Sequence, residues 1–498
     1  MEHSSYISLA IYFIAMLAIG LFAYRNSTDD LSGYMLGGRQ VSPQVTALSA
    51  GASDMSGWML MGLPGAMFTM GFDALWIALG LLLGALLNYL LVAPRLRVFT
   101  EEADDALTLP DFFSKRFNRQ NGSVRMISAA VIILFFTLYT SAGLVAGGKF
   151  FESAFGLGYE TGLLLTVSVV VAYTLLGGFL AVSLTDFVQG CIMFIALVLV
   201  PVVALQRFSS GAEMLEQAGR SIAPLSESFE HMGLLAIISS MAWGLGYFGQ
   251  PHIIVRFMAI RSVKDIKVAR HIGMSWMLVT IIGALATGLI GVAYVNKFAP
   301  GLSDPETIFI LFAEILFHPL ISGFLLAAIL AAIMSTISSQ LLVSSSSLSE
   351  DVYRAVFHKE MDQKTMVTAG RIGVLAVATV ATLLALDNNA SILSLVSNAW
   401  AGFGAAFGPL VLLSLFWPRM THAGAVAGIL SGAVTVLVWS QLPLLPNGQT
   451  LSSLMYEIVP GFIVSTIAIV LVSYLGKAPC QITQAAFLAT KAKLQQAS

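Results

Sequence analysis

The sequence SAGASDMSGW, residues 49–58, lies in the middle of a long apolar stretch that runs from residue 42 to residue 72. It places two glycines, three serines and an aspartate where a membrane-spanning helix is normally apolar. A charged side chain at the centre of a span costs roughly 2.5–3.5 kcal/mol, so we expect water, a cation or a donor to compensate Asp54. The pattern therefore predicts a broken helix with Asp54 on an ion or substrate path. The alternative is that Asp54 caps the second half-helix.

A second interrupted stretch, WGLGYFGQP at residues 243–251, lies inside the apolar run 232–256. Its three glycines and its proline also predict a break, because proline removes a helix hydrogen bond. Non-helical backbone survives at membrane depth only where protein or water satisfies it. Paired broken spans in corresponding halves of a chain are typical of transporters built on inverted repeats. The alternative is that these glycines only allow helices to pack closely.

The composition sets the class of protein. Of the 498 residues, 57% are hydrophobic and 10% are charged, whereas a soluble domain has about 25% charged residues. The net charge of −2 by itself says nothing about nucleic acid, and because no basic tail or basic stripe appears we expect no nucleic-acid partner. The two cysteines are far apart and predict neither a disulfide nor a metal site. We find no nucleophile motif, cofactor loop or ring of charges, so the sequence indicates neither an enzyme nor a channel.

A span needs about 20 apolar residues, and the sequence predicts thirteen membrane helices in one all-α membrane domain, residues 1–498. These spans are 5–24, 42–72, 73–94, 126–154, 160–177, 182–206, 232–256, 272–296, 317–345, 368–386, 391–416, 423–441 and 455–476. Spans 2–6 (residues 42–206) form the first predicted repeat and spans 7–11 (residues 232–416) the second. Residues 1–41 and 417–498 are the peripheral helices and the tail. The connections are expected to be loops.

Basic residues indicate the orientation, because cytoplasmic loops collect Lys and Arg. With thirteen spans, all 25 of these residues fall on one side except Lys149, Arg207, Arg220 and Lys297. The N-terminus is therefore predicted outside and the C-terminus inside. The N-terminus also lacks the basic region of a secretory signal, so span 5–24 is predicted to be uncleaved.

Hydroxyl groups cluster in span 317–345. Ser335, Ser338 and Ser339 share one helix face, and Thr336 lies beside them. Hard cations take oxygen ligands, so the cluster suits a sodium ion if it faces the first break. The alternative is ordinary hydrogen bonding between helices.

The chain resembles the solute:sodium symporter family nearly end to end, and within it the bacterial members that carry proline. The resemblance is carried by five stretches, namely residues 37–39, 46–58, 243–252, 332–338 and 398–409. It implies a LeuT-like fold of five-plus-five inverted repeats with helices 2 and 7 discontinuous. It also implies sodium-coupled symport of L-proline by alternating access, across the inner membrane of a bacterium.

The resemblance also implies roles for particular residues. The sodium ligands would be the backbone carbonyls of Ala52, Met55 and Ala332 and the hydroxyls of Ser335 and Thr336. A second sodium ion would bind at Asp186, Ser338 and Ser339, although Asp186 could instead cap the start of span 182–206. The family pattern leaves the sodium-to-substrate stoichiometry and the oligomeric state open.

The expected substrate is a zwitterion, whose carboxylate suits the free N–H groups near Ser56 and Gly57. Its secondary ammonium can lie over an aromatic face. By resemblance, the pocket is formed by Ser56, Trp58, Tyr139, Trp243, Tyr247 and Pro251. Each aromatic residue has the alternative role of packing.

Arg39, just before the first broken span, is predicted either to pair with an acid in a gate or to anchor at the membrane surface. Two other functions stay open at this stage. The fold could carry another solute, such as pantothenate, a sugar or an organic acid, or it could be a sensor that binds a solute without transporting it.

Overall fold

The structure is a computed structural model that describes residues 3–26, 31–117, 122–223, 232–299, 301–353, 363–387, 391–446 and 448–497. Arg119, Arg354 and Lys359, which support the predicted orientation, lie outside these ranges. The described residues form helices and connections, with a single bridge between Val41 and Ile260 as the only extended pairing among them. The prediction of an all-α protein is confirmed.

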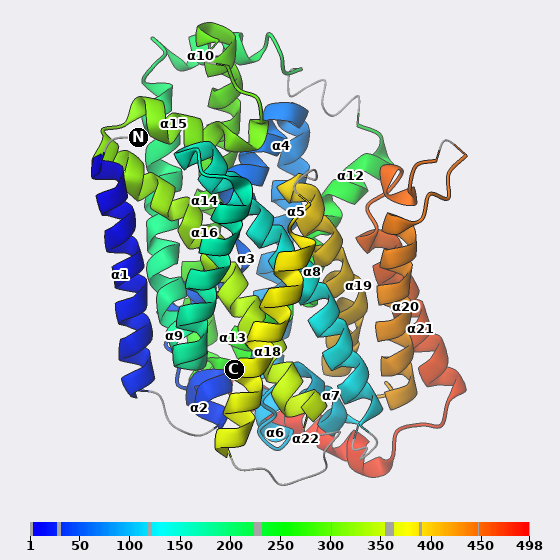
Figure 1. The fold of residues 1–498 in the computed structure, drawn as a ribbon. Helices are drawn as coiled ribbons and strands as arrows, with labels where there is room; N and C mark the ends of the chain where they lie inside the picture. The colour runs from blue at the N-terminus through cyan, green and yellow to red at the C-terminus, as the bar shows by residue number, and fades with distance from the viewer. Residues whose placement is uncertain are drawn as a thin grey trace.

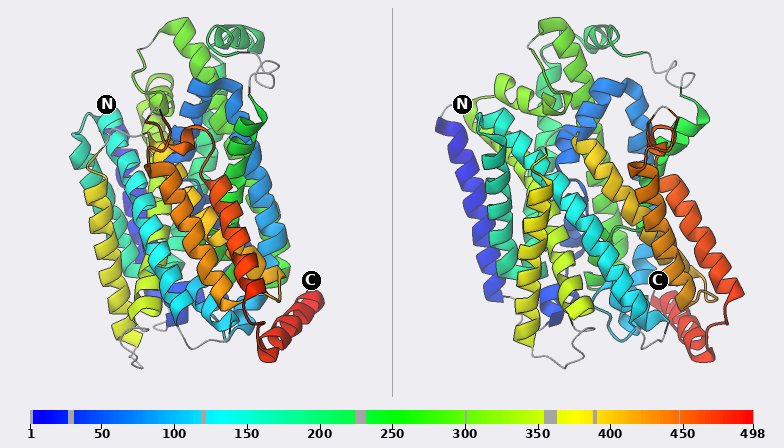
Figure 2. Two further views of the ribbon diagram at one scale, coloured as in Figure 1. Left: turned by 90° about the vertical axis from the view of Figure 1, so that its right-hand side faces the viewer. Right: turned by 45° about the vertical axis from the view of Figure 1, so that its right-hand side comes forward.

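The helices form an elongated bundle with two distinct ends (Figures 1 and 2). One end carries α10 (Gly211–Ala218) and α15 (Ile308–Leu316), and α1 starts there. We call it the α10 side. The other end carries α2 (Leu31–Leu36), α7 (Leu109–Arg116) and α22 (Gln481–Ala497). We call it the α22 side. These short helices lie in connections that the sequence predicted to be loops.

Long helices match the predicted spans. Their bounds are α1 (His3–Asn26), α5 (Ala74–Leu87) continued by η4 (Asn88–Val92) and α6 (Ala93–Glu102), α8 (Ser123–Phe155), α9 (Tyr159–Leu205), α14 (Val263–Phe298), α16 (Pro319–Ser346) continued by η7 (Ser347–Tyr353), α18 (Gln363–Leu384), α19 (Ile392–Phe416), α20 (His422–Gln441) and α21 (Ile458–Leu475). In the described chain, ten helical stretches are long and apolar enough to cross a membrane. The other three predicted spans, 42–72, 160–177 and 232–256, are broken or short. The number thirteen therefore stays a prediction.

Gly178 divides α9 into the two predicted spans 160–177 and 182–206. Its φ of 57° and ψ of −152° are not helical, and a side chain is strained at this φ. A Cβ there would also lie 2.7 Å from the ring of Tyr34. The chain bends here because only glycine fits.

Both predicted breaks are present. The first span consists of α3 (Pro43–Asp54), a break at residues 55–57, η2 (Trp58–Gly62) and α4 (Leu63–Met70). The second consists of α12 (Leu234–Met241), the 3-10 turn η5 (Ala242–Phe248) and α13 (Pro251–Ala259). The two broken helices meet in the core of the bundle, and α3 packs against α9, α13, α14 and α16.

Candidate ion and substrate site

The first break frees backbone groups at the end of α3. The amide of Met55 still donates to the carbonyl of Gly51, but the amide of Ser56 donates to Asp54 at 3.0 Å. The last carbonyls of α3 therefore lack their usual helical partners. A Cβ on Gly57 would lie 3.0 Å from the Cβ of Ala146 in α8, so the chain passes close to that helix.

Four of the five predicted sodium ligands lie together where α3 meets α16. The Ser335 hydroxyl is 2.7 Å from the carbonyl oxygen of Ala52 and 3.0 Å from that of Ala332. The Thr336 hydroxyl is 3.3 Å from the carbonyl oxygen of Ala332. A single Ser335 hydrogen cannot satisfy both carbonyls at full strength. This group of buried neutral oxygens fits the chemistry of a hard monovalent cation.

Met55, the fifth predicted ligand, is the fully buried residue that ends α3. Within the described residues, the hydrogen bond between α3 and α16 goes to Ala52 rather than to Met55. The Met55 sulfur instead accepts a hydrogen bond from Thr280 of α14 at 3.6 Å.

Asp186 lies on α9 in a polar cluster next to this group. Its Oδ2 accepts hydrogen bonds from Ser49 at 2.8 Å and from Ser339 at 3.4 Å. Ser338 points elsewhere and donates to the carbonyl of Ser335 at 3.0 Å. Asp186 lies well inside α9 and is fully buried, so it does not cap the start of a helix.

Arg256 of α13 completes that cluster, and sequence reasoning missed it by placing it in a cytoplasmic loop. Its Nη2 lies 3.1 Å from Asp186 Oδ2 and 2.6 Å from the Ser339 hydroxyl, while Nε donates to Ser49 at 3.1 Å. It also donates to the carbonyl of His252. The side chain is 1% exposed. The signal in the sequence was its position inside the apolar run that follows Pro251.

Asp54 joins the two broken helices. Its Oδ2 accepts a hydrogen bond of 2.5 Å from the Tyr247 hydroxyl, and its carbonyl accepts one of 3.0 Å from the Trp58 indole. Its other carboxylate oxygen, Oδ1, is buried without a partner in the described structure. Among the described residues, no side chain caps η2. The carboxylate therefore bonds across the two breaks and is not a helix cap.

Aromatic side chains surround the breaks. Trp243 stacks on Tyr456 with ring centroids 5.3 Å apart, and its carbonyl accepts a hydrogen bond of 2.7 Å from Trp400. Tyr247 meets Trp400 edge-on at 5.1 Å. Tyr139 of α8 is buried with its ring 5.9 Å from that of His252.

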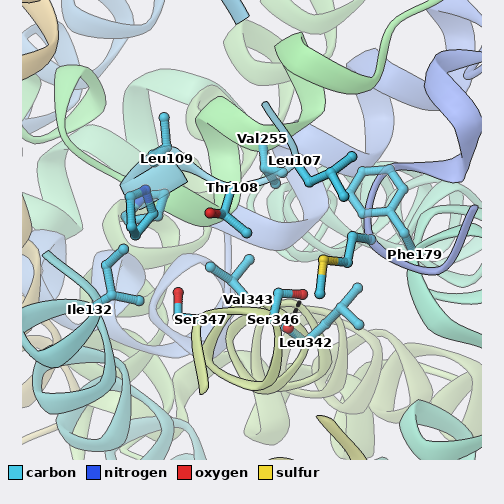
Figure 3. A pocket seen from close by; sticks show the side chains of 13 residues that line it. Leu107, Thr108, Leu109, Ile132, Phe179, Val255, Leu342, Val343, Ser346 and Ser347 are labelled. Carbon is cyan, nitrogen blue, oxygen red and sulfur yellow. Dashed lines mark hydrogen bonds between the residues drawn. The ribbon is translucent and has the colours of Figure 1, made fainter. Parts of the chain in front are cut away.

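The predicted pocket residues do not all line one space. Trp243 lines a cavity of about 610 Å³ on the α10 side, together with Tyr456. Pro251 lines a different cavity, of about 20 Å³, towards the α22 side (Figure 3). Ser56 and Trp58 are buried at the first break and line neither of these cavities, and the Trp58 amide donates weakly to the Ser56 hydroxyl at 3.5 Å.

Arg39 forms the predicted pair with an acid. Nε lies 2.5 Å from Asp105, Nη1 donates to Met258 O at 2.7 Å, and Nη2 donates to Ala106 O at 2.8 Å. The side chain is 7% exposed, so it is not an anchor in the membrane surface. Gly37, Gly38 and Arg39 all have positive φ, which turns the chain sharply and directs Arg39 inwards.

The chain is also similar in sequence to proteins of one known family. The model of the sodium:solute symporter family matches residues 34–432. The chain is 58% identical over 475 residues to the osmoregulated proline transporter OpuE of Bacillus subtilis (strain 168), and the match covers 95% of each protein. It is 54% identical over 480 residues to a sodium/proline symporter of Staphylococcus aureus (strain JH9), which covers 95% of this chain and 93% of the relative.

Solved structures agree on the architecture. A Na⁺-coupled sialic acid symporter in a substrate-bound, outward-open state superimposes with a TM-score of 0.81 at 20% identity, over 96% of this chain and 99% of that one. Mhp1, a transporter of the nucleobase-cation-symport-1 family, gives a TM-score of 0.56 at 13% identity, over 92% and 98% of the two chains. The LeuT-like fold is confirmed, and the chain belongs to the sodium:solute symporter family.

Proposed function

We propose that this protein carries L-proline into a bacterial cell by symport with sodium. The observation that carries the proposal is the contact between Ser335 of α16 and the carbonyl of Ala52 at the first break. The contact gathers hard oxygen ligands where a helix has opened. The names of relatives with 58% and 54% identity supply the solute.

Sodium would bind to the carbonyls of Ala52, Met55 and Ala332 and to the hydroxyls of Ser335 and Thr336. The buried contacts among four of these residues support the assignment. The ion would replace the hydrogen of the Ser335 hydroxyl as the partner of the carbonyls, and so hold α3 against α16. A fixed α3 orders the break that binds the solute, and such coupling between ligands is typically 1–3 kcal/mol.

Proline would bind at the level of the first break. Backbone amides at the first break, next to Ser56 and Trp58, would favour its carboxylate, and the Trp58 amide has only a weak bond of 3.5 Å to the Ser56 hydroxyl. Tyr139, Trp243 and Tyr247 offer aromatic faces to its ammonium group and its ring. Asp54, held by Tyr247, provides a negative charge at the same level. Pro251 starts the half-helix that leads away from the pocket on the α22 side.

Alternating access would open these two sides in turn. Here the cavity on the α10 side is about 610 Å³, whereas the one beside Pro251 is about 20 Å³, which is room for about one water molecule. Arg39, which bonds to Asp105 and to the end of α13, would act as a gate residue on the closed side.

A second sodium ion at Asp186, Ser338 and Ser339 belongs to the same proposal. Asp186 is already neutralised by Arg256 in this conformation. A cation would therefore bind there only after Arg256 has moved away.

The molecule would sit in the inner membrane with thirteen spans, its N-terminus outside and its C-terminus in the cytoplasm. The α22 side would then face the cytoplasm, as its excess of Lys and Arg favours. Residues 42–206 and 232–416 would be the inverted repeats.

The test is uptake of radiolabelled L-proline into proteoliposomes under an inward sodium gradient, with potassium and pH gradients as controls. We expect uptake with sodium only. Folded protein without proline uptake would disprove the choice of solute, and a panel of organic acids, sugars and pantothenate would follow.

A further inference from the structure

One short segment on the α22 side contributes four of the residues that line the cavity beside Pro251. Residues 104–111, which we call the seal segment, run from the end of α6 into α7. Leu107, Thr108 and Leu109 of this segment face the cavity in Figure 3. The remaining lining residues are Met35, Pro110, Ile132, Phe179, Pro251, Val255, Leu342, Val343, Ser346 and Ser347. The seal segment thus lies across the path from the first break towards the α22 side.

One end of the seal segment is held by Arg39. The guanidinium contacts the carboxylate of Asp105 at 2.5 Å and the carbonyl of Ala106 at 2.8 Å. Since Arg39 lies just before α3, this contact connects the segment to the first broken helix.

The other end is held by the Thr108 hydroxyl, which has two partners. It accepts a hydrogen bond from the amide of Asp111 at 3.1 Å, which caps α7, and it donates one to Asp351 Oδ1 at 2.9 Å. Asp351 is completely buried and lies in η7, which continues α16 without a break. The helix that carries Ser335 and Thr336 therefore ends on the seal segment.

A purely electrostatic role for Asp351 does not account for this geometry. Arg125 contacts Asp351 at 2.8 Å, but Glu350 at 2.9 Å and Asp111 at 3.5 Å already provide it with negative charge. Lys115 also contacts Asp111 at 2.9 Å, so three acids share two cations and one acid is in excess. Asp351 Oδ1 also accepts the hydrogen bond from Thr108. Asp351 Oδ2 is buried without a partner in the part of the chain that the structure describes.

We propose that the seal segment is the inner gate of the solute path and that the hydrogen bond from Thr108 to Asp351 couples it to the sodium-binding helix α16. A shift of α16 moves Asp351, breaks this bond and frees the segment to leave the cavity. The proposal rests on the proposed function for the direction of the path, but it does not depend on which solute is carried.

The experiment measures access to the cavity with a cysteine reporter. Ser347 lines the cavity, is 1% exposed, and its hydroxyl is buried without a partner in the described residues, so Ser347→Cys is a mild change. Cys191 and Cys480 are replaced by serine. The full-length protein in detergent is reacted with a polar maleimide in potassium buffer and then in sodium buffer.

The parent reporter should react slowly. Thr108→Val removes the hydrogen bond to the charged Asp351. Since the loss of such a bond is enough for about a tenfold change in an equilibrium, we expect the Ser347→Cys reporter to be labelled about tenfold faster. Thr108→Ser keeps the hydroxyl and should match the parent. Thr421→Val is the matched control, because the Thr421 hydroxyl caps another helix, α20, by accepting a hydrogen bond from the Gly424 amide at 3.1 Å. Thr421 does not line the cavity. It should also match the parent.

The coupling to α16 has its own readout. Sodium should change the labelling rate of the parent and of Thr108→Ser, and should have much less effect on Thr108→Val. If Thr108→Val does not yield folded protein, Asp351→Leu tests the same bond, because leucine has no acceptor for the Thr108 hydroxyl, and it should also label faster. Equal rates for Thr108→Val and Thr108→Ser, or an equal increase in Thr421→Val, would overturn the proposal. A lack of proline uptake with the expected labelling pattern would reject only the solute.

Discussion

Arg256 and Asp186 form an ion pair of 3.1 Å whose side chains are 1% and 0% exposed. The pair connects α13, the second half of a broken helix, to α9. Ser49 of α3 and Ser339 of α16 bond to the same two side chains. Four helices therefore share one charged contact, and this contact would have to change if they move relative to each other in the proposed alternating access.

Removing one partner of this pair should destabilise the protein strongly. Arg256→Gln leaves Asp186 as a buried charge without its counterion, and such changes cost about 3–5 kcal/mol. We expect a clear drop in the melting temperature of the purified protein in detergent. The double variant Arg256→Gln with Asp186→Asn should recover much of the loss, because no charge is left unpaired. A double variant that is no more stable than Arg256→Gln alone would show that the two residues are not coupled.

Sodium activation tests the second ion at Asp186. If two ions bind, the Hill coefficient of sodium-dependent proline uptake should exceed one in the native protein. It should fall to about one in Asp186→Asn, which keeps hydrogen-bonding capacity but lacks the charge. Activation curves in proteoliposomes at fixed proline concentration measure both values. A coefficient of one in the two proteins would leave only the site at Ala52 and Ser335.

The hydroxyls of α16 should control the affinity for sodium. We expect Ser335→Ala and Thr336→Ala each to raise the sodium concentration for half-maximal uptake about tenfold, because each removes one oxygen ligand and about 1.4 kcal/mol corresponds to tenfold in binding. Protein level should change little. Ser322→Ala, at a buried serine in the first turns of the same helix, is the matched control and should behave as the native protein. Unchanged sodium dependence in both site variants would remove this site.

Much of the fold could be predicted because membrane helices leave a strong local signal. The two breaks, the division between spans 160–177 and 182–206 and the hydroxyl cluster of α16 all follow from residue types at membrane depth, where an unsatisfied group is costly. The contact between Asp54 and Tyr247, in contrast, joins residues on two broken helices far apart in the chain. A sequence pattern identifies each break but does not say which side chains meet across them.

Arg256 shows most clearly where prediction from the sequence fails. A basic residue near the end of an apolar run is usually found at a membrane surface, and the prediction followed that tendency. The half-helix α13 instead starts in the middle of the bundle at Pro251, so its second turn is still deep inside. Only the position of α13 against Asp186 explains why the charge is tolerated. The same holds for Thr108 and Asp351, which are far apart in the chain and meet through the ends of α7 and η7.

The bond between Tyr247 and Asp54 should be needed for solute binding. Tyr247→Phe removes the hydroxyl that donates to Asp54 Oδ2 at 2.5 Å, and among the described residues it leaves both carboxylate oxygens of Asp54 without a donor. A hydrogen bond to a charged group contributes about 1.5–3 kcal/mol, so we expect at least about tenfold weaker proline binding. Tyr159→Phe removes a buried hydroxyl that donates to Ala385 O on another part of the bundle, and it should bind proline normally. Equilibrium binding of radiolabelled proline in saturating sodium distinguishes the two, and equal affinities would contradict the role of Tyr247.

The glycines of the second break also have a packing role. A Cβ on Gly244 would lie 2.2 Å from the carbonyl oxygen of Gly80, and a Cβ on Gly84 would lie 2.2 Å from the carbonyl oxygen of Gly244. The η5 turn and α5 therefore touch backbone to backbone, and neither has a side chain that can give way.

Gly244→Ala and Gly84→Ala should each force the two segments apart. Overpacking a tight contact costs about 1–3 kcal/mol and more where backbone must shift, so we expect lower melting temperatures and weaker proline uptake in both. Gly211→Ala is the matched control, because a Cβ there meets no atom of the described residues within 4 Å. Melting curves and uptake in proteoliposomes measure the two effects separately. If Gly244→Ala has the melting temperature of the control but loses uptake, the contact matters for movement of the broken helix rather than for its packing. If Gly244→Ala keeps both the melting temperature and the uptake of the control, η5 and α5 do not touch as closely as their glycines allow.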